Sequence, residues 1–148
     1  MKTVFYHENK AKWHIIDAKD NVLGKVASLA ASLLRGKYNV TYTPHIVMGD
    51  HVIIINARRA FLTGRKYNNK LYWKHSGYPG GIRSESYKGI LAKKPTFPME
   101  HAVKGMLPKN KLGRALFRNL YVYADANHLH IAQKPVERNN LLQTRKQS

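Results

Sequence analysis

A run of apolar β-branched residues at positions 51–57 (HVIIINA) restricts the fold of this chain more than any other feature. Strands of this composition are usually buried on both faces, as in the interior of a parallel sheet. A second short apolar segment at 13–18 (WHIIDA) also has the composition of a strand. Parallel strands must be joined by a long crossover connection, usually a helix. Because the residues between these two segments have a helical pattern, we predict a βαβ unit and an α/β fold.

The intervening segment has the periodicity of an amphipathic helix. Asp20 and Asn21 precede it as turn or N-cap residues, and Gly36 follows it in the position of a C′ glycine. The apolar residues recur every three or four positions in two sets: Val22, Val26, Leu29 and Leu33, and Leu23, Ala27, Ala30 and Leu34. We therefore predict a helix from Val22 to a point just before Gly36, followed by a loop at 42–50.

The remaining chain predicts shorter elements. Residues 60–63 and 70–75 are typical of two short strands in a protruding hairpin, with Arg65 and Lys66 near its turn. Residues 76–81 (SGYPGG) contain too many glycines for any regular element. The other predicted elements are helices at 84–92, 98–107 and 110–118, the last with Asn110 as its N-cap, and a strand at 120–124.

A single domain accounts for this pattern. A chain of 148 residues with 43% hydrophobic content is long enough to build one core. We place that domain at 13–135. An N-terminal extension at 1–12 precedes it, and a polar C-terminal tail at 136–148, which we expect to be mobile, follows it.

The chain is strongly basic, and its charge is concentrated in the middle. It contains 26 Lys and Arg against 8 Asp and Glu, a formal net charge of +18. Residues 57–118 alone hold 15 basic and 2 acidic residues, a net charge of +13. Aromatic residues are interleaved with them: Phe61, Tyr67, Tyr72, Trp73, Tyr78, Tyr87, Phe97 and Phe117. Such a surface suits phosphates and exposed bases or sugars, so nucleic acid is the expected partner.

Several other classes of protein are disfavoured. There is no cysteine, which excludes disulfides, thiol catalysis and sulfur-ligated zinc sites. No apolar run reaches the roughly 18 residues of a membrane-spanning helix. The N-terminal residues also lack the apolar core of a secretory signal. We expect a soluble cytoplasmic protein, and a peripheral binder of anionic lipid is a weaker alternative.

An enzyme that acts on RNA or nucleotides is the main alternative. Gly24 and Lys25 stand at the start of the predicted helix, where backbone N–H groups can hold a phosphate. However, the sequence has neither glycine-rich nucleotide-binding fingerprint, no G-x-S-x-G motif and no paired carboxylates. His128 and His130 lack a third ligand at metal-binding spacing, which favours a role in packing or RNA contact. We predict no catalytic residue, no cofactor, no metal and no small-molecule substrate.

A stretch at 103–114 sets basic residues between apolar helix positions. Its spacing fits two amphipathic helices with solvated outer faces as well as it fits an RNA-contacting surface. Gly105 and Gly113 each cost a helix about 1 kcal/mol relative to alanine. Their presence favours a close approach by another backbone, from protein or RNA.

These stretches closely resemble the large-subunit ribosomal protein L13 family, in its bacterial and organellar form. The resemblance runs from Trp13 to Pro135, and its most specific parts are the blocks at 76–81 and 103–114. Other matching stretches are 16–18 (IDA), 23–25 (LGK), 34–37 (LRGK), 41–45 (TYTPH), 62–64 (LTG) and 122–124 (VYA).

The resemblance implies a three-layer α/β/α fold around a four-stranded parallel sheet, to which the predicted basic hairpin is added. It also implies direct binding to large-subunit rRNA, neighbouring large-subunit ribosomal proteins as partners, a role in early subunit assembly and no enzymatic activity. A bacterial ribosome is favoured over an organellar one. The positions that match the RNA-facing residues of the family are Lys25, Arg35, Lys37, Thr43, His45, His75, Tyr78, Lys104, Lys109, Asn110, Arg114 and Arg118. From the basic segment we add Arg65, Lys66, Lys74, Arg83 and Lys111.

Overall fold

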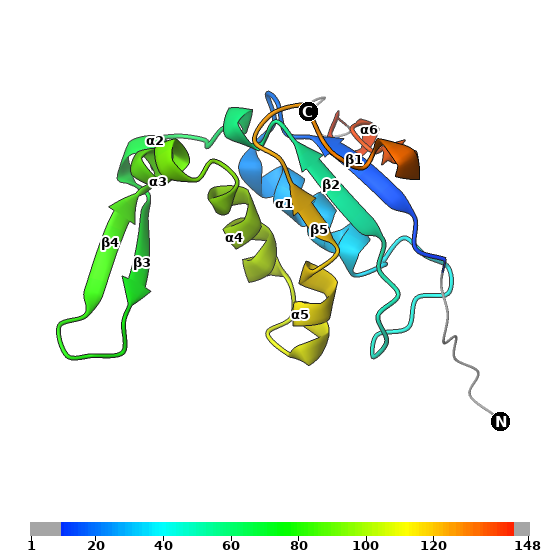
Figure 1. The fold of residues 1–148 in the computed structure, drawn as a ribbon, viewed down its shortest axis with the longest axis horizontal. Coiled ribbons are helices and arrows are strands. Elements are labelled where there is room, and N and C mark those ends of the chain that lie inside the picture. The colour runs from blue at the N-terminus through cyan, green and yellow to red at the C-terminus, as the bar shows by residue number, and fades with distance from the viewer. Residues whose placement is uncertain (1–9, 144–148) are drawn as a thin grey trace.

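Four short parallel strands form the central sheet of the computed structural model, which describes residues 10–143. They are β1 (Trp13–Asp17), β2 (His51–Ile55), β5 (Leu120–Val122) and β6 (Val136–Glu137), in the spatial order β5-β2-β1-β6 (Figure 1). β1 and β2 pair along their whole length, from Trp13 opposite His51 to Asp17 opposite Ile55. The predicted α/β class and four-stranded parallel sheet are confirmed.

The centre of β2 is buried on both faces, as its composition predicts. Val52, Ile53 and Ile54 are each 0% exposed. The strand nevertheless ends at Ile55, before the predicted position 57. The reason is the backbone of Asn56, whose φ of 55° leaves the β region and leads into the 3₁₀ turn η1 (Ala57–Arg59).

The crossover helix α1 (Leu23–Leu34) packs on one face of the sheet. Eight of its twelve residues are buried, and Ile16, Val52 and Ile54 share their hydrophobic core. Helix α4 (Phe97–Met106) packs against α1. The chain leaves α1 through Gly36 with a φ of +76°, so the predicted C′ glycine is confirmed. A Cβ at this position would lie only 2.5 Å from the carbonyl oxygen of Met48.

Aromatic rings cover the opposite face of the sheet. Trp13 stacks on His51 with ring centroids 4.3 Å apart, and on Tyr121 at 5.4 Å. His130 lies over this stack, with its centroid 5.0 Å from that of Trp13 and 4.4 Å from that of Tyr121. The outer layer on this face is therefore the segment that joins β5 to β6, which includes the 3₁₀ turn η2 (Ile131–Gln133).

The predicted C-terminal tail begins with ordered structure. Residues 136–143, which we expected to be mobile, form β6 and the short helix α6 (Asn140–Gln143), and Leu142 is buried in the core. Sequence inspection missed β6 because two residues show no periodicity. Residues 144–148, and residues 1–9 of the predicted N-terminal extension, lie outside the described residues.

The hairpin is formed by other segments than those predicted. Residues 60–63 are not a strand, and Phe61 makes only an isolated bridge to Val22. The hairpin pairs β3 (Leu71–His75) with β4 (Ile82–Ser86), and a one-turn helix, α2 (Lys66–Asn69), leads into it. The stretch 76–81 is its loop, where Gly77 and Gly80 supply the positive φ values of 90° and 69° that close it. The prediction that 76–81 forms no regular element is confirmed.

The helices after the hairpin largely agree with prediction. Helix α3 (Tyr87–Lys93) begins later than the predicted residue 84, because Ser86 is its N-cap and accepts a hydrogen bond from the N–H of Gly89. Helix α4 carries Pro98 in its first turn as predicted. Helix α5 (Lys111–Phe117) is capped by Asn110, whose side-chain oxygen accepts from the N–H of Gly113 at 2.8 Å.

Candidate nucleic-acid interface

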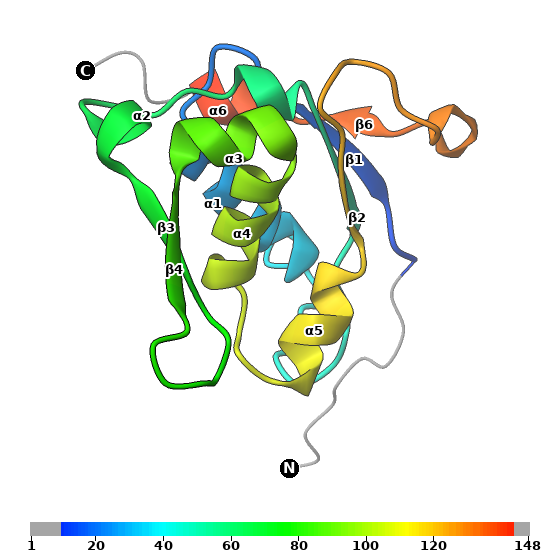
Figure 2. The same ribbon diagram turned by 60° about the vertical axis from the view of Figure 1, so that its left-hand side comes forward.

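Three segments lie at one end of the molecule, where β2 and β5 begin, and two of them contain Lys and Arg. They are the loop at 35–49, the hairpin loop at 76–81, and residues 104–118 around α5; we call them together the basic end. Figures 1 and 2 both show these segments at the lower end of the view. The first and third are packed together, since a Cβ at Gly49 would lie 1.5 Å from the carbonyl oxygen of Leu34 and 3.2 Å from Leu116. Only glycine fits at this junction.

The turn between α4 and α5 presents a row of cations. Lys104, Lys109, Lys111, Arg114 and Arg118 are all exposed to solvent. The turn itself is tight, because a Cβ at Gly113 would lie 1.8 Å from the carbonyl oxygen of Pro108. The close backbone that Gly113 accommodates is therefore the protein's own. Gly105, by contrast, has no atom within 4 Å of its Cβ position, so an RNA backbone there stays a prediction.

The loop at 35–49 is held by its own hydrogen bonds. Arg35 donates from Nε to the Tyr42 hydroxyl at 3.0 Å, and Asn39 donates to the carbonyl of Met48 at 3.0 Å. Thr43 is buried, and its hydroxyl donates to the carbonyl of Thr41. Lys37 and His45 are exposed on the outside of this framework.

A buried polar network anchors the start of β2 beneath this loop. His14 on β1 donates from Nε2 to Asp50 at 3.0 Å, and the N–H of Lys12 donates to the other carboxylate oxygen of Asp50. Arg138, directly after β6, donates to Nδ1 of His14 at 3.3 Å. Burial alone would raise the pKa of Asp50, but the hydrogen bonds from His14 and Lys12 outweigh it and hold that pKa below its usual value. The ionised carboxylate therefore stabilises the fold.

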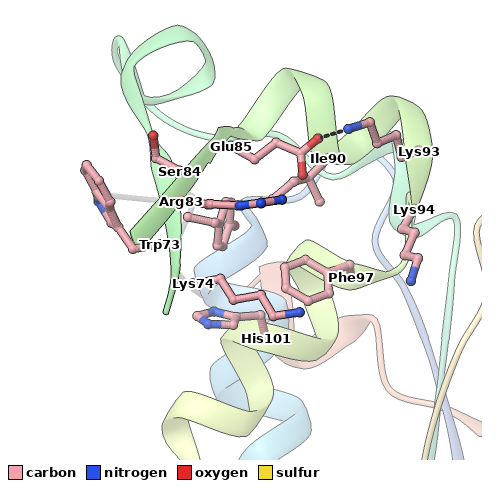
Figure 3. Close-up of a pocket in the computed structure, with 11 residues that line it drawn as sticks. Trp73, Lys74, Arg83, Ser84, Glu85, Ile90, Lys93, Lys94, Phe97 and His101 are labelled. Atoms are coloured by element: carbon pink, nitrogen blue, oxygen red, sulfur yellow. Dashed lines mark hydrogen bonds and ion pairs between the residues drawn. The ribbon is translucent and has the colours of Figure 1, made fainter. Parts of the chain in front are cut away.

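A groove of about 690 Å³ separates the hairpin from α3 and α4. Tyr72 is among the residues that line it. Lys74 and Arg83 extend into it from the hairpin, while Phe97 and His101 of α4 form its floor (Figure 3). The Tyr72 ring contacts Phe97 and His101 edge to face, with centroids 5.8 and 5.2 Å away. Burial and the neighbouring Tyr87 raise the pKa of Tyr72 to about 12, so its hydroxyl keeps its proton at neutral pH.

At the opposite end of the sheet, where α/β enzymes usually bind cofactors, groups of the protein are hydrogen-bonded to one another. Asp17, at the end of β1, accepts a hydrogen bond from Asn56 at 2.9 Å, and its N–H donates to Asn139 at 2.8 Å. At the nearby start of α1, the N–H of Leu23 donates to the carbonyl of Phe61. These contacts tie the ends of β1 and β2 to the residues that follow β6, and the start of α1 to Phe61.

A family model described as Ribosomal protein L13 matches residues 11–129. The chain belongs to the ribosomal protein L13 family. Curated relatives named large ribosomal subunit protein uL13 include one from Treponema pallidum, 49% identical over 92% of this chain and 97% of its own length. Another, from Borrelia duttonii, is 57% identical over 80% of each chain, and one from Aeromonas salmonicida is 51% identical over 85% of this chain and 89% of its own.

Membership in the L13 family confirms the prediction of a ribosomal protein without enzymatic activity. Among residues 10–143, no helix has the length and apolar character needed to cross a bilayer. In the same range no group of three or more His, Asp or Glu side chains is arranged to hold a metal ion. His130 instead packs against Trp13 and Tyr121.

The residues predicted to bind rRNA fall into separate groups. Eleven of the predicted positions lie on the basic end: Arg35, Lys37, Thr43, His45, Tyr78, Lys104, Lys109, Asn110, Lys111, Arg114 and Arg118. Lys74, His75 and Arg83 lie on the hairpin strands above its loop. Lys25, in the first turn of α1, and Arg65 and Lys66, around α2, lie toward the other end and do not join either group (Figure 2).

Two predicted contacts have structural roles in the isolated protein. Thr43 is buried, and Asn110 caps α5, so their side chains already have partners. Sequence reasoning also missed residues that line the groove, namely Trp73, Lys93, Lys94, Phe97 and His101. The i, i+4 spacing of Phe97 and His101 would have placed both rings on one face of α4.

Proposed function

We propose that this protein is a structural constituent of the large ribosomal subunit and binds large-subunit rRNA through its basic end. The observation that carries the proposal is the lack of carboxylate partners for the cations around α5 within the described residues. Among residues 10–143, the ion pairs are His14 with Asp50 and Lys93 with Glu85, and neither involves the cations around α5. Because clustered like charges repel one another, phosphates are the partners that this surface fits.

Family membership supports this assignment, since the relatives are named as large-subunit proteins. The proposal includes contacts with neighbouring large-subunit proteins, a role early in subunit assembly and a location on the cytoplasmic ribosome of a bacterium. The bacterial sources of these relatives favour the last point. Early assembly predicts that the protein is present in pulse-labelled precursors of the subunit; its presence only in mature subunits would contradict that part.

Charge reversal tests the assigned surface. Lys104→Glu, Lys109→Glu and Arg114→Glu should each reduce incorporation into the large subunit, while the circular dichroism spectrum and melting temperature stay unchanged. Lys19→Glu, an exposed residue beyond the carboxyl end of β1, provides the matched control and should incorporate normally. Incorporation of all three variants at the wild-type level would refute the basic end as the RNA-binding surface.

The salt dependence of binding gives a second test with purified rRNA. Each phosphate neutralised lowers the slope of log K against log salt by about 0.7 to 0.9. Neutralising a contacting lysine, as in Lys109→Gln, should therefore make the slope shallower by about one contact. A slope near zero for the wild type would mean that phosphates are not the main partners.

A further inference from the structure

The groove between the hairpin and α4 combines unpaired cations with an aromatic floor. Four basic side chains line it, Lys74, Arg83, Lys93 and Lys94, against the single carboxylate of Glu85. Lys93 already forms an ion pair with Glu85 at the upper rim (Figure 3). Among residues 10–143, no carboxylate lies within ion-pair distance of Lys74 or Arg83. The groove therefore has an unneutralised positive charge.

The positions of the two unpaired cations, Lys74 and Arg83, make the hairpin less stable. Lys74 lies directly opposite Arg83 in the β3–β4 register, and like charges in such a pair are destabilising. The register also puts both on the same side as the Tyr72 and Glu85 pair, and Figure 3 shows both side chains extending over the floor of the groove. An anion between them would remove the repulsion.

The floor offers ring faces beside these cations. Phe97 is half-buried and His101 is exposed, and their centroids are 5.7 Å apart with the planes tilted by 35°. Tyr72 meets both rings through an edge-to-face contact. A planar ligand that stacks on this floor would carry its charged group toward Lys74 and Arg83.

The size of the groove limits what can enter it. A volume of about 690 Å³ falls in the range of roughly 300–1,000 Å³ that takes molecules of nucleotide size, and it is too small for a duplex. Protein–protein interfaces are depleted in lysine, whereas three lysines line this groove. Unpaired RNA bases are commonly recognised by stacking on aromatic side chains together with phosphate contacts.

We propose that this groove binds one unpaired nucleotide of an RNA strand, with its base against Phe97 and His101 and its phosphate between Lys74 and Arg83. The inference rests on the proposed rRNA-binding function and adds a second mode of contact to it. The basic end neutralises backbone phosphates of folded RNA, whereas the groove selects a nucleotide that is free of base pairing.

Binding of two fluorescently labelled RNAs to the full-length protein tests this assignment. One RNA is a short single-stranded oligonucleotide and the other is a duplex of the same length. The double variant Lys74→Gln, Arg83→Gln should lower single-strand affinity by about tenfold and duplex affinity by less than about twofold. The matched control, Lys109→Gln with Lys111→Gln, removes the same charge from the basic end and should weaken duplex binding at least as much as single-strand binding.

The readouts separate failure of the groove from failure of the proposed function. If the groove variant weakens both RNAs equally, the groove assignment is overturned while rRNA binding stands. If the wild type binds neither RNA, the proposed function itself fails. If AMP binds as tightly as the oligonucleotide, a free nucleotide is the ligand. If polyglutamate at equal charge displaces the oligonucleotide, an acidic protein is the favoured ligand. Either result overturns the proposal.

Crosslinking locates the bound base independently of affinity. A single-stranded oligonucleotide that carries 4-thiouridine should crosslink to Tyr72, Phe97 or His101, as identified by mass spectrometry. The exposed variant His101→Ala should reduce the crosslink yield without changing the circular dichroism spectrum. Crosslinks confined to Trp73 and Tyr78, outside the floor of the groove, would overturn the assignment.

Discussion

The parallel sheet and the β3–β4 hairpin differ in how much of their side-chain surface is buried. The centre of β2 is completely buried between helices and rings, whereas β3 and β4 leave Leu71, Trp73 and Ile82 between 45% and 64% exposed. A two-stranded hairpin is only marginally stable alone, and this one is supported mainly where Tyr72 packs on Tyr87 and α4. The sheet therefore accounts for most of the stability of the molecule, while the hairpin leaves most of its surface exposed.

The largest expected difference comes from equal truncations in the two regions. Ile54→Ala leaves a cavity in the core and should lower the free energy of unfolding by about 2–5 kcal/mol. Ile82→Ala removes the same atoms from an exposed strand and should change it by less than about 0.5 kcal/mol. Urea unfolding of both variants measures the contrast, and similar losses would show that the hairpin is part of the stabilising core.

The buried network at the start of β2 should give the next largest effect. Asp50→Asn removes the carboxylate that accepts from His14 and from the N–H of Lys12, and we expect a loss of about 1–3 kcal/mol in unfolding free energy. Asp125→Asn, at an exposed position, is the control. An Asp50→Asn variant as stable as the wild type would mean that the network contributes specificity and not stability.

A smaller effect concerns His51 and pH. Burial lowers the pKa of His51 below its ordinary 6.5, so the unfolded chain takes up a proton first as the solution is acidified. The stability from neutral His51 is fully present above pH 6.5 and is lost as pH falls through the lower folded pKa. Asp50 adds a second loss below its unfolded value of 3.8, because its folded pKa is also lowered.

His51→Phe tests this account. It keeps the stacking on Trp13, removes the titration and removes a buried Nδ1 atom that has no hydrogen-bond partner. We expect a gain of about 1 kcal/mol and a flatter stability profile below pH 6.5. A His51→Phe profile as steep as that of the wild type would assign the acid sensitivity to other groups.

The smallest effect is a gain in stability from the hairpin. Lys74→Thr removes the like-charge pair with Arg83 and should stabilise the isolated protein by about 0.2–1 kcal/mol at low salt. The gain should vanish at high salt, because exposed charges are screened. Thermal melts at two salt concentrations measure it, with Lys111→Thr as the control. A loss of stability at low salt would show that the lysine supports the hairpin.

The same contrast explains what could be predicted from sequence. The burial of 52–54 and the periodicity of 22–34 reflect a water-excluding core, and both elements lie where they were predicted. Helix caps also require particular residue types, so the predictions of Gly36 as a C′ residue and of Asn110 as an N-cap are confirmed. These signals exist because burial and capping constrain which residue types are allowed.

The sequences of the exposed elements show no such pattern of burial or capping. Strand β4 (IRSES) has no buried face to impose alternation, so its residues were read partly as a helix. Strand β6 is fixed by pairing with β1 and by Arg138 reaching His14, contacts between residues more than 120 positions apart. The groove was missed for the same reason, since it exists only where β3 and β4 meet α4.

The pairing of β6 with β1 has a consequence for the protein during its own synthesis. β6, the last of the four strands in the chain, covers the edge of β1, the first, so the sheet cannot be completed until Val136 and Glu137 have been made. Until then the outer edge of β1 is open to pairing with another chain. Nascent chains that stop before Val136 should therefore self-associate or recruit a chaperone, whereas chains that include β6 should not.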